Sequence, residues 1–124
     1  MIEYPTKVLL ATDGTPDSEA ATTLAVALAS REGAELHVVH VGYAAFSTTG
    51  TTVGGGSLPG QPAGYAEQQA RMLLEEGAER IREAGGDVCG SHLRMGQPAQ
   101  EVVGLSEEMG ADLLVIGSGR PRAV

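Results

Sequence analysis

Two short loops in the sequence carry residue types that can hold a small polar ligand. Asp13 and Gly14 follow the apolar run Val8–Ala11, and the stretch Gly117-Ser118-Gly119-Arg120 follows the apolar run Leu113–Ile116. A carboxylate at the end of a buried strand can accept hydrogen bonds from a ribose hydroxyl or a ring amine. Glycines after a strand let backbone N–H groups approach a phosphate, and an arginine can pair with it. Together the two loops predict a crevice for a ligand of nucleotide size.

Each loop also has a simpler interpretation. Asp13 can be a helix-capping or turn aspartate, and the Gly-Ser-Gly sequence can be a plain turn. The phosphate-loop signature Gly-x4-Gly-Lys-Ser/Thr is absent from the sequence, and so is Gly-x-Gly-x-x-Gly. The residues alone therefore leave a ligand site and two ordinary turns both open.

No other part of the sequence supplies a persuasive catalytic centre. His37 and His40 have opposite parity on a predicted strand, so they should face opposite sides of the sheet. No His, Cys, Asp and Glu cluster has metal-ligand spacing, and Ser18 has no histidine near it in sequence. We expect Cys89 to be a small buried residue rather than a reactive thiol. The sequence thus favours a binding protein over an enzyme; an ATPase, or a redox protein using Cys89, is the lowest-ranked alternative.

The elements that must position these loops alternate regularly along the chain. The predicted strands cover Lys7–Thr12, Glu35–Val41, Asp87–Leu93 and Asp112–Ile116, and the predicted helices cover Pro16–Arg31, Tyr65–Ala84 and a segment from Pro98 to Gly110. Such alternation predicts an α/β fold, with an open parallel sheet covered by helices on both faces. Residues expected to face the core are Ala20, Ala21, Leu24, Ala25 and Leu28 of the first helix, and Val102, Val103 and Met109 of the third. In the second helix, apolar residues recur at helical spacing: Ala66, Ala70, Leu73, Leu74, Gly77, Ala78 and Ile81.

Length and composition narrow the class further. The 124 residues fit one domain over 1–124, within which the Gly-, Ser- and Thr-rich segment 43–64 should be either a flexible loop or a lid over the crevice. The net charge is −8, with 16 acids against 8 Lys and Arg. We therefore expect no nucleic-acid partner and no binding to an anionic membrane surface. A single cysteine and the absence of a long apolar run favour a cytoplasmic protein.

The motifs taken together resemble the universal stress protein family. Three stretches carry the resemblance: Val8-Leu-Leu-Ala-Thr-Asp13-Gly14-Thr-Pro-Asp-Ser18, Leu36-His-Val-Val-His-Val41, and Met95-Gly96-Gln-Pro98 followed by Gly110-Ala-Asp-Leu-Leu-Val-Ile-Gly117-Ser118. The resemblance covers the chain apart from the long loop. It implies a five-stranded, Rossmann-like fold that is usually dimeric and that binds ATP, ADP or AMP, with magnesium as an accompanying cation.

The resemblance also implies which residues line the nucleotide site. Asp13, in the turn with Gly14, would face the ribose or adenine, Ala11 and Thr12 would line the end of the first strand, and Val41 would contact the base. Met95 and Gly96 would border the pocket. The phosphate loop would begin at Ile116 and Gly117 and continue through Ser118, Gly119 and Arg120.

The sequence departs from the family pattern at this phosphate loop. ATP-binding members carry Gly-x-x-Gly, nine further residues and then Gly-Ser/Thr, whereas Arg120 stands where the second glycine belongs. The final Gly-Ser/Thr step, the last helix and the fifth strand have no counterpart before Val124. We expect the natural protein to continue beyond this residue; the alternative is a member with an altered loop that binds nucleotide poorly. The predicted function is an ATP-binding regulator of the stress response, and the alternative is a nucleotide-independent module that binds proteins.

Overall fold

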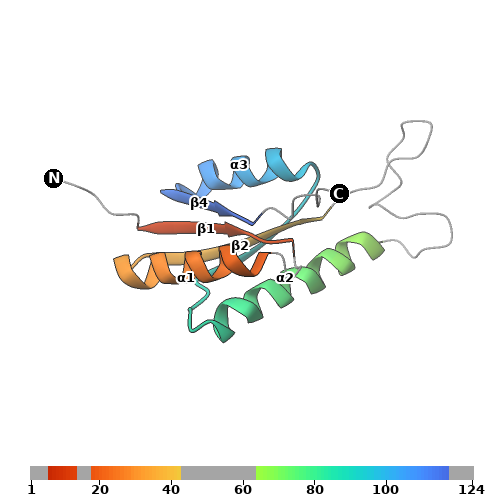
Figure 1. Ribbon diagram of the computed structural model, residues 1–124. Helices are drawn as coiled ribbons and strands as arrows, with labels where there is room; N and C mark the ends of the chain where they lie inside the picture. Colours follow the sequence, from red (N-terminus) through yellow and green to blue (C-terminus); the bar gives the residue numbers. More distant parts are fainter. Residues whose placement is uncertain (1–5, 14–17, 43–63, 118–124) are drawn as a thin grey trace, which may run out of the picture.

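The computed structural model describes residues 6–13, 18–42 and 64–117. Its elements in chain order are β1 (Lys7–Ala11), α1 (Glu19–Glu32), β2 (Glu35–Gly42), α2 (Tyr65–Glu83), β3 (Gly90–Met95), α3 (Pro98–Met109) and β4 (Leu113–Ile116). The predictions for Gly14, for most of segment 43–64, and for Ser118, Gly119 and Arg120 fall outside the described residues. The predicted α/β class and the alternation of strands and helices are confirmed (Figure 1).

The four strands form one parallel sheet in the order β3-β2-β1-β4. The chain moves outward from β1 to β2 and β3, and then crosses back to place β4 on the other side of β1. Leu10 pairs with Val38 on one side and with Val115 on the other, so β1 is the central strand of the fold. Its buried residues Val8, Leu9 and Leu10 are apolar without alternation, as expected for a strand covered on both faces.

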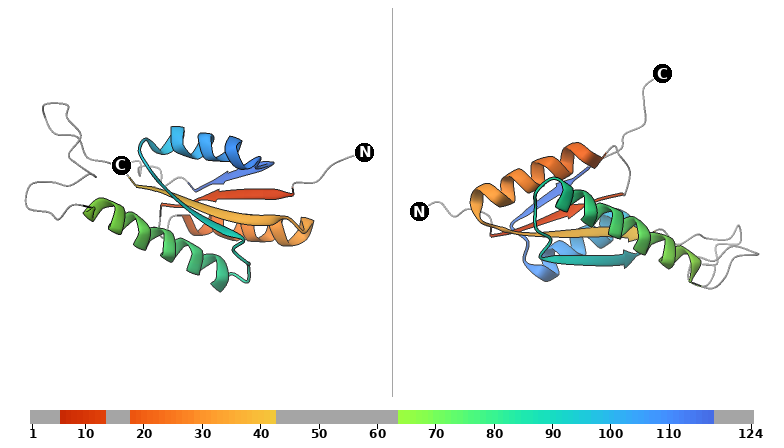
Figure 2. Two further views of the ribbon diagram at one scale, coloured as in Figure 1. Left: turned by 180° about the vertical axis from the view of Figure 1, so that it is seen from behind. Right: turned by 90° about the horizontal axis from the view of Figure 1, so that it is seen from below.

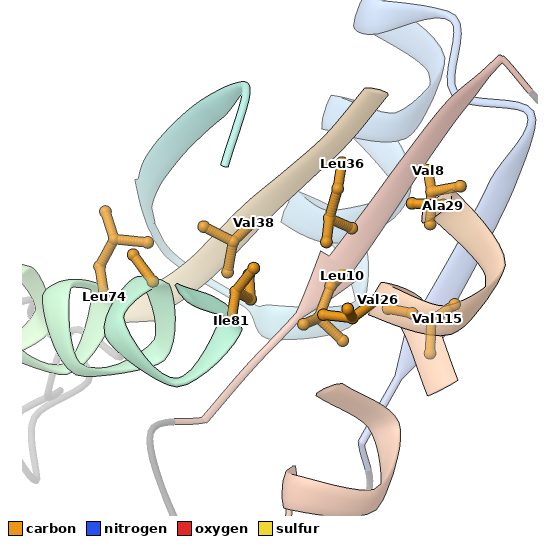
Figure 3. Packing of buried hydrophobic residues seen from close by; sticks show 11 residues of the cluster. Val8, Leu10, Val26, Ala29, Leu36, Val38, Leu74, Ile81 and Val115 are labelled. Carbon is orange, nitrogen blue, oxygen red and sulfur yellow. The ribbon is translucent and has the colours of Figure 1, made fainter. Parts of the chain in front are cut away.

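Helices cover the two faces of this sheet, as predicted. Helices α1 and α2 lie on one face and α3 lies on the other (Figures 1 and 2). The larger core fills the space under α1 and α2, where Val8, Leu10 and Val38 meet Val26 and Ile81 (Figure 3). The smaller core under α3 contains Leu9, Val39, Val102 and Leu105. Small and branched side chains fill both layers, consistent with an aromatic content of only 3%.

The face that α1 turns to the sheet differs from the prediction. Its buried residues are Thr22, Ala25, Val26 and Ala29. Ala25 is the only buried residue that the predicted stripe contained, and Leu24 is 53% exposed. An alanine-rich helix offers several nearly equivalent apolar faces, so periodicity alone does not fix its rotation. The prediction for α2 was better: Ala70, Leu74, Gly77, Ala78 and Ile81 are buried as expected.

Strand β3 begins and ends later than predicted. It runs over Gly90–Met95, so Cys89 precedes the strand and is exposed. The expectation of a buried cysteine was therefore wrong. Strand β3 is an edge strand of the sheet, and burial there is incomplete along its whole length.

The start of the central strand is tied to the start of β4 by one carboxylate. Asp112 Oδ2 accepts hydrogen bonds from Thr6 N at 2.9 Å, from Thr6 Oγ1 at 2.8 Å and from Lys7 N at 3.0 Å. The bonds from Thr6, first of all from its hydroxyl, lower the pKa of the Asp112 carboxyl below its ordinary value. This connection fixes the register of β1 and β4, whose opposite ends form the crevice described next.

Candidate ligand-binding crevice

A pocket lies at the carboxyl ends of β1, β2 and β4, beside the first turns of α3. Its volume is about 350 Å³. Strand order reverses beside β1, and in open parallel sheets this is the place where ligands bind. The pocket is lined by Ala11, Thr12, Asp13, Val39, His40, Val41, Pro98, Ala99, Val102, Val103, Ile116 and Gly117. The loops after β1 and β4 thus border the same cavity.

Six of the residues predicted from the sequence are brought together here. They are Ala11, Thr12, Asp13, Val41, Ile116 and Gly117. The register explains their proximity, because Ala11 pairs with Ile116 and the two loops leave the sheet directly after this pair. Their role in nucleotide binding remains a prediction.

Met95 and Gly96 do not line this pocket. Met95 ends the edge strand β3, where it pairs with Gly42. A Cβ atom at Gly42 would lie 2.6 Å from Met95 Sδ and 2.7 Å from Ala70 Cβ, which places Met95 on the face covered by α2. The Gly96 N–H donates to Gly42 O at 2.9 Å. Both residues thus pack around the end of β2, one strand farther from the centre than the resemblance implied.

The wall formed by α3 was missed by sequence reasoning. Pro98, Ala99, Val102 and Val103 line the pocket, and Val103 is 50% exposed rather than turned to the core as predicted. Part of this wall could have been inferred from the sequence, because the connection from β3 to β4 must carry α3 across the ends of the central strands. Proline at the first helical position then places an apolar first turn against the crevice.

Hydrogen bonds hold the loop after β1 in place. His40 Nδ1 donates to Thr12 O at 2.7 Å, and Thr12 N donates to Val39 O at 3.0 Å. The Thr12 and Ser18 hydroxyls are 3.3 Å apart, and both residues are buried. These bonds fix the backbone from which Asp13 projects. His40 is thus a buried anchor for this loop.

Two glycines allow helices to approach these loops closely. A Cβ atom at Gly77 of α2 would lie 2.6 Å from Thr12 Cγ2. A Cβ atom at Gly117 would lie 2.8 Å from Ser18 Cβ and 3.0 Å from Ser18 Cα. Contacts shorter than 3.0 Å require a shift of the surrounding atoms, so any larger residue at either position would displace a crevice loop.

The described lining is mainly apolar and carries one acid, Asp13. Among the residues that the structure places around this pocket there is no Lys or Arg. Flat apolar walls suit an aromatic ring, and a carboxylate suits hydroxyl or amine donors. A phosphate group would find no cationic side chain among these described residues.

A second polar cluster lies near the opposite end of the same sheet face. His37 Nε2 donates to Glu35 Oε1 at 3.0 Å, and His37 Nδ1 is 3.3 Å from His92 Nε2. The bond from His37 lowers the pKa of the Glu35 carboxyl. Partial burial lowers the pKa of His92, and neighbouring His37 and Arg94 lower it further.

Residues 6–13, 18–42 and 64–117 contain no group of three or more His, Cys, Asp or Glu side chains placed to hold a metal ion. None of the helices over the same ranges is long and apolar enough to cross a membrane.

An open parallel sheet with a crevice at its switch point defines an α/β protein with a Rossmann-like architecture. A model of the universal stress protein family matches residues 5–124, and this chain belongs to that family. It is 32% identical over 116 residues to the universal stress protein YxiE of Bacillus subtilis (strain 168), across 90% of this chain and 78% of that protein.

Solved structures support the fold. One is a universal stress protein in complex with cAMP, with a TM-score of 0.62 and 23% identity, covering 90% of this chain and 71% of that one. Another is the universal stress protein of Archaeoglobus fulgidus in complex with dAMP, with a TM-score of 0.64 and 24% identity. That match covers 94% of this chain and 82% of the other.

Proposed function

We propose that this chain binds an adenine nucleotide, with ATP as the expected ligand, and acts as a non-enzymatic regulator in the stress response. The observation that carries the proposal is the pocket itself, where Asp13 and Gly117 border one cavity at the strand switch point. Solved members of the family hold cAMP and dAMP, which share the adenine ring and a sugar phosphate.

The size and polarity of the cavity indicate which part of the ligand each part of the site would hold. A cavity of about 350 Å³ lies at the lower end of the range for small-molecule pockets. It suits a base and its ribose, with the base against Val41 and Val102 and a ribose hydroxyl near Asp13. The phosphates would then extend toward the loop that begins at Gly117, where backbone N–H groups can hold them. Asp13 also offers the oxygen donor that magnesium takes.

A binding role fits the polar groups of the crevice better than catalysis does. His40, the histidine of the lining, uses Nδ1 to hold the Thr12 carbonyl at 2.7 Å, so its hydrogen bond serves the loop. We propose that the cytoplasm is the working compartment and that the protein works as a homodimer.

The second candidate is a nucleotide-independent module that binds proteins. It is favoured by one observation: within the described lining, no cationic side chain is present to pair with phosphate. A thermal-shift titration with ATP, ADP and AMP separates the two candidates. A ligand at 100 times its dissociation constant adds about 2.7 kcal/mol to the free energy of unfolding, which gives a clear shift. An unchanged melting temperature at millimolar nucleotide would favour the second candidate.

Calorimetry on variants tests the assigned residue. We predict that Asp13→Ala weakens ATP binding by about ten-fold, the effect of losing one hydrogen bond to a charged group. Asp87→Ala is the matched control, because Asp87 is an exposed aspartate at the opposite edge of the sheet. Repeating the titration with EDTA measures the contribution of magnesium. Equal ATP affinity in the wild type and Asp13→Ala would remove Asp13 from the site.

A further inference from the structure

Two histidines from neighbouring strands meet on the sheet face that carries α3, outside the lining of the crevice. His37 lies near the start of β2 and His92 lies on β3, 55 positions later in the sequence. Their ring nitrogens, Nδ1 of His37 and Nε2 of His92, are 3.3 Å apart. The His37 side chain is 14% exposed, so the pair is accessible from solvent but largely sheltered.

The carboxylate of Glu35 determines which ring nitrogen of His37 carries the proton and which one offers a lone pair toward His92. An ionised carboxylate only accepts hydrogen bonds, so Nε2 of His37 must carry the proton that it donates at 3.0 Å. In the neutral ring, Nδ1 is then the basic nitrogen, and it points to His92. A carboxylate behind an imidazole in this way is the arrangement that orients histidine ligands in metal sites.

Gly90 lets the backbone of β3 lie directly beside the two rings. It pairs with His37 across the strands. A Cβ atom at Gly90 would lie 2.6 Å from Nδ1 of His37 and 3.3 Å from Nε2 of His92. A side chain at this position would therefore push the His37 ring away from His92.

The distance between these nitrogens suits chelation. Zinc binds imidazole nitrogen at about 2.0–2.1 Å with tetrahedral geometry, which separates two such nitrogens by roughly 3.3 Å. The observed separation is 3.3 Å. A zinc ion would take the place of the proton that His92 Nε2 now shares with His37 Nδ1, and that proton would move to the other nitrogen of His92 or to solvent.

We propose that His37 and His92 form a binding site for a divalent transition metal of the zinc class, with Glu35 as the positioning carboxylate. Water completes the coordination, since no third protein ligand lies close enough within the described ranges. The bound ion links β2 to the edge strand β3. Arg94, also on β3, is paired with Glu108 of α3 at 3.0 Å.

Zinc chloride titration of the untagged full chain tests this site by calorimetry in a non-chelating buffer at neutral pH. The expected result is one zinc ion per chain in the wild type, with binding lost in His37→Ala and in His92→Ala. Gly90→Ala keeps both ligands but puts a methyl group against His37 Nδ1, and it strains no backbone angle because Gly90 lies outside the left-handed region. We expect it to abolish binding too.

Two more variants distinguish zinc binding at the His37–His92 site from zinc binding elsewhere on the chain. Glu35→Gln retains an acceptor for His37 but removes the charge, and should weaken zinc binding by about ten-fold or more. Cys89→Ser controls for the exposed thiol and should bind zinc like the wild type. Circular dichroism and ATP titration show whether each variant is folded. Zinc binding that persists in folded His37→Ala or Gly90→Ala, or that disappears in Cys89→Ser, would overturn the proposal.

Discussion

Two helical glycines should respond in opposite ways to the same substitution. Gly77 of α2 faces Thr12, and a Cβ atom there would lie 2.6 Å from Thr12 Cγ2. Gly104 of α3 has no atom within 4 Å of the corresponding position. Thr12 cannot move aside easily, because it is buried, branched at Cβ and hydrogen-bonded through its hydroxyl to Ser18.

The magnitudes follow from two competing terms. Alanine stabilises a helix interior relative to glycine by about 0.5–1 kcal/mol, and this gain applies to both positions. Overpacking costs about 1–3 kcal/mol, and it applies only where the new methyl group meets Thr12. We therefore predict that Gly104→Ala raises the free energy of unfolding by about 0.5–1 kcal/mol. The free energy of unfolding of Gly77→Ala should be lower than that of Gly104→Ala by about 1–3 kcal/mol.

Urea unfolding followed by circular dichroism measures both variants against the wild type. Since Thr12 lines the crevice, ATP titration adds a second comparison, in which Gly77→Ala should bind more weakly and Gly104→Ala should bind normally. If the two variants are stabilised equally, α2 does not pack against the end of β1 as described, and the positioning of the crevice loop would have to be reconsidered.

Three further outcomes are expected. Leu9→Ala should lower the free energy of unfolding by about 2–5 kcal/mol in urea, because Leu9 is fully buried under α3; a loss below about 1 kcal/mol would contradict that core. The pKa of the Asp112 carboxyl is lowered from its ordinary value of 3.8. The ionised carboxylate therefore stabilises the fold fully at a pH above 3.8, and this stabilisation is lost as the pH falls through the pKa of the folded state. The stability difference between wild type and Asp112→Asn should accordingly shrink on acidification, and a difference that does not change with pH would refute this. His40→Ala removes the bond to the Thr12 carbonyl and should weaken ATP binding, whereas equal affinity by calorimetry would show that the loop does not need this anchor.

Much of the fold could be predicted because the spacing of apolar residues within a single strand or helix shows which of its faces is buried. The uninterrupted apolar run of β1 and the strong periodicity of α2 identified both elements, and α2 buries the expected residues. The rotation of α1 could not be predicted, since an alanine-rich helix has no single dominant apolar face and Leu24 lies outside. The start of β3 was misplaced because an edge strand is only half buried and carries a weak pattern.

The site was predictable to the extent that it depends on strand ends. Asp13 and Gly117 follow strands that pair with each other, so their loops must meet. Val102 and Val103 could not be assigned to the crevice, because their position depends on where α3 crosses the sheet. Likewise, the contact between His37 and His92 joins residues 55 positions apart and depends on the register of β2 and β3.

The central claim is that an adenine nucleotide occupies the cavity between the ends of β1 and β4. Nitrogen–proton correlation spectra recorded during ATP titration test it most directly, because they report each backbone amide separately. We predict saturable shifts that concentrate at Asp13, Val41, Ala99 and Gly117, while the amide of His37 stays in place. Shifts centred elsewhere, or spectra unchanged at millimolar ATP, would contradict the claim.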